Sequence, residues 1–163
     1  MHTENWLNVE TLPRFRDPMT ALLYGSRIYL VHATSGEPVP PMFNLLFSQV
    51  LSADTQAAMI EALDFLVFHS TESLNIHSLD CTCVSVHERA LADAIRAIQA
   101  GSLIGYQTAM EQVLLPEDAM SIGPIVQVIA SELMQVERSG FVQSVNVTAP
   151  KSFAQKPLSV ALH

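Results

Sequence analysis

Apolar residues recur at helical spacing along most of this chain, and helix start and stop signals divide the pattern into segments. Asp17 followed by Pro18 predicts a helix start, because aspartate caps free backbone amides and proline fits the first helical position. The run that follows, to about residue 33, is apolar on most sides, which predicts a central or interface helix. Gly36 and three nearby prolines end that helix, and residues 42–51 predict a short second one.

Capping patterns mark the starts of the next two helices. Ser52 or Asp54 caps a helix that is expected to run to about residue 69. Residues 70–84 have no helical pattern and predict a loop. Ser85 and Glu88 then form a capping box, in which the serine hydroxyl and the glutamate carboxylate each satisfy a free backbone amide. The apolar stripe that follows them, opposite charged residues, predicts a surface helix.

Two more helices are predicted by the remaining part of the pattern. Gly101 stands where the preceding helix should end, and Ser102 can cap a short helix that reaches about residue 114. Pro116 begins a long last helix, which is expected to reach Arg138. Pro124 lies inside that pattern, and because proline removes a backbone donor it should kink the helix or postpone its start.

These segments predict an all-α fold, a compact bundle of about six helices with an extended N-terminal arm and an extended C-terminal tail. A chain of 163 residues is most simply one domain. We expect residues 1–143 to form this single helical domain, with residues 1–16 as its arm. Residues 144–163 contain two prolines and no helical pattern, so we expect them to form the tail and to pack on a neighbouring subunit.

The composition is unusually apolar for a chain of this size. Hydrophobic residues make up 49% of the sequence and charged residues 15%, against about 25% charged in a typical soluble domain. The mean hydropathy of +0.28 indicates more apolar surface than one small globule buries. No stretch reaches the ~18 uninterrupted apolar residues that a membrane-spanning helix needs. We therefore expect a homo-oligomer with an apolar interface, most simply a dimer.

The charge balance is acidic, with a formal net charge of −8. Without a stripe of basic residues, binding to nucleic acid or to an anionic membrane surface is not expected. The first residues lack a basic region followed by an apolar core, so no secretory signal is expected. The two cysteines are one residue apart and cannot hold a secreted fold together. A cytoplasmic location is the resulting expectation.

Candidate chemistry is concentrated in the stretch from His77 to His87, which contains both cysteines and two of the six histidines in the order H-x3-C-x-C-x3-H. His77, Cys81, Cys83 and His87 are together the four ligands that zinc or another transition metal would take. The spacing argues against this hypothesis, because structural zinc loops more often use C-x2-C. His87 also falls in the first turn of a predicted helix.

Two other interpretations of the same stretch remain open. Cys83 precedes the predicted N-cap Ser85 by two residues, where free amides and the helix dipole stabilise a thiolate. His77 or His87 would then lower the pKa of that thiol further or act as a base. The simplest interpretation is structural, since free cysteines often pack in the core as small apolar side chains.

The sequence does not identify a reaction, because it contains no phosphate-binding loop, dinucleotide-binding pattern, nucleophile elbow or H-E-x-x-H motif. Our leading hypothesis is a non-enzymatic cytoplasmic binding or regulatory protein with a metal- or redox-responsive Cys/His stretch. One alternative is a small thiol- or metal-dependent enzyme with its site near the same helix start. The other is a purely structural interaction protein whose apolar excess forms one interface.

Overall fold

A computed structural model describes residues 15–39, 41–75, 77–79 and 81–141 of the chain. These residues form six α-helices and no strand, which confirms the predicted all-α fold. The tail predicted at residues 144–163, and all of the arm except Phe15 and Arg16, lie outside the described residues. The helices are α1 (Pro18–Ser35), α2 (Pro41–Ser48), α3 (Ala53–His69), α4 (Val86–Gln99), α5 (Leu103–Met110) and α6 (Pro116–Arg138).

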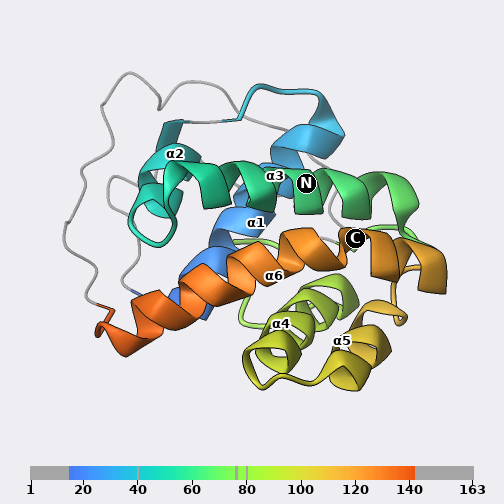
Figure 1. The fold of residues 1–163 in the computed structure, drawn as a ribbon. Coiled ribbons are helices and arrows are strands. Elements are labelled where there is room, and N and C mark those ends of the chain that lie inside the picture. Colours follow the sequence, from blue (N-terminus) through green and yellow to red (C-terminus); the bar gives the residue numbers. More distant parts are fainter. Residues whose placement is uncertain (1–14, 40, 76, 80, 142–163) are drawn as a thin grey trace.

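The longest helix, α6, organises the bundle. Figure 1 shows α6, in orange, passing between α3 on one side and the α4–α5 pair on the other, and it also contacts α1. The first three helices contact one another, while α5 packs chiefly on α4. A smaller contact joins α1 to α4, and this contact brings the middle of α1 close to the segment between α3 and α4.

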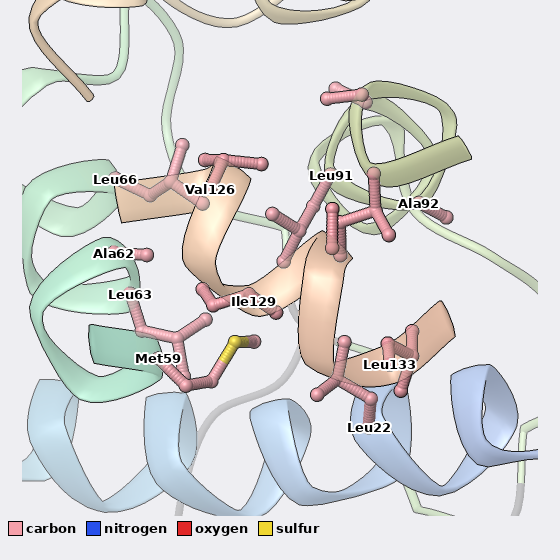
Figure 2. Close-up of a cluster of buried hydrophobic side chains, with 14 of the residues drawn as sticks. Leu22, Met59, Ala62, Leu63, Leu66, Leu91, Ala92, Val126, Ile129 and Leu133 are labelled. Atoms are coloured by element: carbon pink, nitrogen blue, oxygen red, sulfur yellow. The ribbon is translucent and has the colours of Figure 1, made fainter. Parts of the chain in front are cut away.

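The core forms where the apolar stripes of these helices meet. Figure 2 shows Leu66 and Leu63 of α3 beside Val126 and Ile129 of α6, respectively. Leu91 of α4 approaches α6 from the opposite side, and Leu22 of α1 closes the cluster. Each of these side chains is at most 2% exposed. Because buried residues recur every three or four positions along α6, one helix contributes to the packing on both sides.

Local capping explains why several helices begin where they do. The Asp17 side chain accepts a hydrogen bond from the Thr20 amide at the start of α1. Gly36 ends α1 with φ of 72°, a left-handed conformation that glycine adopts without steric cost. At α4, Ser85 and Glu88 form the predicted capping box.

The sequence predicts that Pro124 either kinks the last helix or postpones its start. The start of α6 is not postponed. The helix begins at Pro116 and continues through Pro124. Proline removes one backbone hydrogen bond at this point. Ile122 and Val126, on either side, are fully buried, so core packing stabilises the helical path through the proline. Tertiary burial here outweighs the local preference.

By length and composition, α6 is the one helix in the described part of the chain that could cross a membrane, with 33% of its most apolar window buried. The core helix of a soluble protein meets the same criterion. Ile122, Val126, Ile129 and Leu133 of α6 are fully buried against the other helices.

Candidate functional site: the cysteine loop and Arg27

The segment that carries both cysteines lies between α3 and α4 and leads directly into the first turn of α4. We call the described residues 77–79 and 81–84 the cysteine loop. The structure joins Cys81 and Cys83 in a disulfide bond, with 5.4 Å between their Cα atoms, a separation within the usual range for disulfides. Cys81 is half-buried and Cys83 is exposed. The structural interpretation, in which both cysteines pack in the core as free thiols, is therefore wrong.

Arg27, a buried residue of α1, binds the backbone of the cysteine loop. Nη1 of Arg27 donates hydrogen bonds to the backbone carbonyls of Ser78, at 3.1 Å, and Cys81, at 2.7 Å. Nη2 donates to the carbonyl of Cys83 at 2.5 Å. Three carbonyl groups of one short loop thus converge on a single guanidinium group from another helix.

The same guanidinium group pairs with Glu88 of α4. Arg27 Nε donates to Glu88 Oε1, and Nη2 donates to Oε2 at 3.1 Å. Together with the carbonyl bonds, these give Arg27 five acceptors within the described residues, which equals the number of N–H donors on a guanidinium group. A buried charge needs such complete pairing, because desolvation without partners is costly.

Glu88 has a second role, because it belongs to the capping box of α4. Its Oε2 accepts a hydrogen bond from the Ser85 amide at 2.8 Å, while the Ser85 hydroxyl accepts one from the Glu88 amide at 3.2 Å. Glu88 is only 6% exposed. One carboxylate therefore connects the start of α4 to Arg27, and Arg27 connects both to the cysteine loop.

Three of the four predicted metal ligands gather in the structure. The donor atoms of His77, Cys81 and Cys83 all lie within 4.8 Å of one another. His77 and Cys81 are half-buried and Cys83 is exposed, so the group lies at the surface of the molecule. The cluster joins an imidazole to two sulfur atoms, a donor set that suits thiophilic metal ions.

The fourth predicted ligand, His87, is not part of this cluster. It is buried in the first turn of α4, and its Nε2 lies 2.7 Å from Ser70 Oγ. The Ser70 hydroxyl also lies 3.2 Å from the Val113 carbonyl, so it joins His87 to the segment that follows α5. Burial lowers the pKa of His87, although the nearby charge of Glu72 opposes this. His87 thus connects α4 to the end of α3.

The direction of His87 follows from helical geometry. Successive residues of a helix are rotated by about 100°, so adjacent positions cannot face the same neighbour. Glu88 faces Arg27 and the cysteine loop, whereas His87 faces Ser70. A symmetric H-x3-C-x-C-x3-H spacing in the sequence therefore does not produce a symmetric site, because its last member is inside a helix.

The chemistry available at the cysteine loop is thiol–disulfide exchange. Cys83 is the more exposed of the two cysteines, and its amide donates a hydrogen bond to Cys81 Sγ at 3.3 Å. Such a donor, together with the nearby helix N-terminus, stabilises negative charge on the Cys81 sulfur when it leaves. The loop therefore has one sulfur suited to attack and one suited to departure.

Sequence reasoning did not identify Arg27 as part of the site. Its five acceptors belong to residues 51 to 61 positions away: three are backbone carbonyls, which leave no signature in the sequence, and two are the oxygens of a single carboxylate. The available signal is a single arginine in the middle of an otherwise apolar helix. A charge in such a position requires a buried partner.

Other titratable groups that the sequence suggested have structural contacts. His69 lies 3.3 Å from Asp118, and its ring stacks on Phe65, so it connects the end of α3 to the start of α6. Asp64 accepts a hydrogen bond from the Tyr29 hydroxyl at 2.6 Å, which joins α3 to α1. These residues hold helices together and are not grouped as a site.

Comparison of this chain with protein-family models, with curated protein sequences and with solved structures gave no match.

Proposed function

We propose that this protein is a non-enzymatic regulatory or binding module, in which the Cys81–Cys83 pair changes between disulfide and dithiol. One observation carries the proposal: the backbone carbonyls of both cysteines are acceptors for buried Arg27, which also pairs with the capping-box residue Glu88. A change at the two sulfur atoms is therefore connected, through a continuous set of hydrogen bonds, to the start of α4.

The disulfide itself is a poor structural crosslink. It closes a loop with one residue between the two cysteines. On the chain-entropy account, so short a loop stabilises a fold by about 1.5 kcal/mol, half of the ~3 kcal/mol expected for a 15-residue loop. A disulfide that adds so little to stability is better suited to changing its redox state than to holding the bundle together.

Reduction acts on the backbone of the cysteine loop. The ring formed with the disulfide restrains the carbonyls of Cys81 and Cys83 toward Arg27, and opening the ring releases that restraint. A hydrogen bond to a charged group contributes ~1.5–3 kcal/mol. Weakening one such bond changes a local equilibrium by about tenfold or more, which is enough for a regulatory response.

The redox step is a two-electron exchange with a cellular thiol. The thiolate attacks Cys83 Sγ, a mixed disulfide forms there, and Cys81 leaves as a thiolate that takes a proton from water. A second thiol attacks the mixed disulfide, which releases the external disulfide and leaves Cys83 as a thiol. The protein gains two electrons and two protons, and the two external thiols lose them.

The cytoplasmic location expected from the composition belongs to this proposal. Cytosolic thiols are kept reduced, and disulfides that form there are usually transient, catalytic or redox-sensing. In that compartment the dithiol is the resting form, and the disulfide forms during oxidative stress. The proposal also includes the expected homo-oligomer, most simply a dimer. A second copy of the chain is then the binding partner, and the interface between the copies is a surface that the redox change can regulate.

Hydrogen exchange on the full chain tests the connection between the two sulfurs and α4. We expect amides of the first turn of α4 to exchange about tenfold faster in the dithiol form than in the disulfide form, while α6 is unchanged. The Cys81→Ser, Cys83→Ser double variant is the control and should not respond to oxidant or reductant. Equal exchange at α4 in both redox forms would contradict the proposal.

A thiol-dependent enzyme is the second candidate, and one specific observation favours it. The more exposed residue Cys83 and the hydrogen-bonded sulfur of Cys81 have the asymmetry of a thiol–disulfide oxidoreductase pair. Catalytic turnover of a small disulfide substrate, abolished by Cys83→Ser, would establish this activity. Stoichiometric oxidation without turnover would support the regulatory module instead.

A further inference from the structure

The reduced cysteine loop carries donor atoms for a metal ion that the disulfide form cannot bind. From the cluster of His77, Cys81 and Cys83, we infer a redox-gated site for a thiophilic divalent cation, of which Zn²⁺ is the best fit. The inference rests on the proposed function in one respect, since both cysteines must be reducible. It adds the ion that is bound, the residues that bind it, and metal binding as the consequence of reduction.

The distances suit a metal ion after reduction. Zinc binds thiolate sulfur at ~2.3 Å and imidazole nitrogen at ~2.0 Å, so tetrahedral ligands stand ~3.3–3.8 Å apart. The three donor atoms already lie within 4.8 Å of one another. Once the S–S bond opens, the sulfurs need only separate to non-bonded distance, while the imidazole moves by a small amount.

The charge balance also suits a divalent cation. Two thiolates and a neutral imidazole neutralise Zn²⁺, so the occupied cluster carries no net charge. Arg27, the buried cation that binds the loop carbonyls, is already paired with the Glu88 carboxylate and does not leave an uncompensated positive charge beside the site. Its guanidinium group binds the loop carbonyls, so the side chains of the cysteines are free to face the metal.

The ligand set differs from the four residues expected from the sequence. His87 shares a hydrogen bond with Ser70 through Nε2, is buried, and lies outside the cluster. Three protein ligands leave one position for water or a small exogenous ligand, an arrangement found in zinc sites that interact with solutes rather than in closed structural sites.

Metal binding and disulfide formation exclude one another, because zinc needs thiolates and a disulfide has none. In the loading step a dithiol reductant transfers two electrons to the Cys81–Cys83 bond and becomes a disulfide. Zn²⁺ then binds the two thiolates, and the two protons of the reductant go to solvent. Oxidation reverses the balance and releases the ion, so the metal content reports the redox state.

Titration of the full-length protein, without a histidine tag, tests the inference. The phosphine-reduced and the oxidised chains are each titrated with Zn²⁺, and with Co²⁺ as a spectroscopic probe of thiolate ligation. We expect one ion per reduced chain, with thiolate-to-cobalt charge-transfer bands, and less than about one-tenth of an ion per oxidised chain.

Variants identify the ligands. His77→Ala should weaken Zn²⁺ binding by about tenfold or more. Losing a residue that only supports a metal ligand costs about 10–100-fold in affinity, and losing a direct ligand should cost at least as much. His69→Ala is the matched control, since His69 is a half-exposed histidine outside the cluster, and it should leave the affinity unchanged. His87→Gln should also leave the affinity unchanged, with thermal unfolding used to confirm that the variant is folded.

The outcomes separate this inference from the proposed function. A reduced chain, shown by thiol alkylation to carry two free thiols, that binds less than about one-tenth of a zinc ion overturns the metal site and leaves the redox proposal standing. Equal binding by oxidised and reduced chains overturns the gating. A chain whose cysteines stay free in oxidised glutathione overturns the redox proposal, while zinc binding by that chain would still support the ligand set.

Discussion

At the scale of single residues, Arg27 determines how the cysteine loop is held. It is buried in the middle of α1, and its five hydrogen bonds divide between loop carbonyls and the Glu88 carboxylate. A guanidinium group has five N–H donors on three nitrogen atoms, spread around one plane, so it can bind several acceptors at once. An ammonium group has three N–H donors on a single nitrogen atom. The geometry is therefore specific to arginine and not only to positive charge.

Replacing Arg27 by lysine tests this specificity. We expect Arg27→Lys to lower the free energy of unfolding by about 2 kcal/mol, since the charge is kept but most of the carbonyl bonds are lost. Arg27→Met should cost about 3–5 kcal/mol, because it leaves Glu88 buried without its partner. Urea denaturation measures both.

Arg89, an exposed arginine of α4, gives the matched control for this substitution. Arg89→Lys should change the free energy of unfolding by less than about 0.5 kcal/mol. An equally small effect of Arg27→Lys would show that the carbonyl contacts contribute little to stability.

A second residue-scale feature is the carboxylate of Glu132, which caps α3 from α6. It accepts hydrogen bonds from the Ser52 amide, at 2.6 Å, and from the Ser52 hydroxyl, at 2.9 Å. Partial burial raises the pKa of Glu132, but the hydrogen bonds from Thr55 and Ser52 outweigh it, so the net shift is downward. The charged form is therefore favoured in the folded state.

This pKa shift predicts a pH dependence of stability. A carboxylate with a depressed folded-state pKa stabilises the protein above its unfolded-state pKa, and the contribution disappears as the pH falls through the folded-state value. Glu132→Gln should destabilise the protein by about 1 kcal/mol at pH 7, as for loss of an N-cap, and by much less near pH 3. Urea denaturation at both pH values measures the difference.

Exposed Glu137 of the same helix supplies the control, and Glu137→Gln should have little effect at either pH. A destabilisation by Glu132→Gln that is equal at both pH values would contradict the assigned role of the charge.

At the scale of elements, α1 and α2 approach closely because Gly25 has no side chain. A Cβ atom at Gly25 would lie 2.1 Å from Cε1 of Phe47, which is fully buried, so the ring or the helix that carries it would have to shift. By contrast, a Cβ atom at Gly123 of α6 would lie 3.5 Å from its nearest neighbour, which is ordinary contact. The two glycines are in helices but differ in what surrounds them.

This difference predicts opposite effects of the same substitution. Gly25→Ala should destabilise the protein by about 1–3 kcal/mol through overpacking, despite the better helix propensity of alanine. Gly123→Ala should stabilise it by up to about 1 kcal/mol, because it gains that propensity without a clash. Thermal unfolding of both variants checks the prediction, and stabilisation by Gly25→Ala would show that α2 can shift.

Helix positions followed from the sequence because their causes are local. The starts of α1, α4 and α6 depend on caps and prolines within a few residues, and these signals placed them correctly. The contact of Gly25 with Phe47 has no such local signal, since two different helices create it. Pro124 is the reverse case, in which a local signal was overruled by burial.

The site followed from the sequence only in part, for the same reason. The spacing located the cysteine loop and three donor residues that the structure brings together. It could not provide Arg27, whose acceptors are distant in the chain, or the disulfide, which depends on the backbone of the loop. His87 was included by spacing alone, although its helical position turns it to Ser70.

At the scale of the whole molecule, the apolar excess of the sequence corresponds to apolar side chains on the surface. Among the described residues, several large apolar side chains are exposed, with Phe68 at 82% and Ile104 at 78% the most exposed of them. The others are Val84, Val86, Leu103, Leu115, Met120 and Val128. Single exposed apolar residues are common, so association must be measured rather than inferred from their number.

We expect the protein to form a homodimer in solution, as its composition suggests. Sedimentation velocity over a range of concentrations should give a dimer mass, and Phe68→Ser and Ile104→Ser, made separately, should show which surface is involved by raising the dissociation constant at least tenfold. Exposed Thr82 of the cysteine loop provides a control position, as Thr82→Ser should not alter the mass. A monomer at all concentrations would contradict this expectation.

The way Arg27 binds the loop also has a consequence for how this sequence can diverge. Its loop acceptors are main-chain carbonyls, which every amino acid supplies, so side chains such as Thr82 can drift in related chains without loss of the contact. Positions 27 and 88 have no such freedom, since each buries a charge that the other neutralises. In any set of relatives, these two positions should be retained together or replaced together by an uncharged pair, whatever happens between the cysteines.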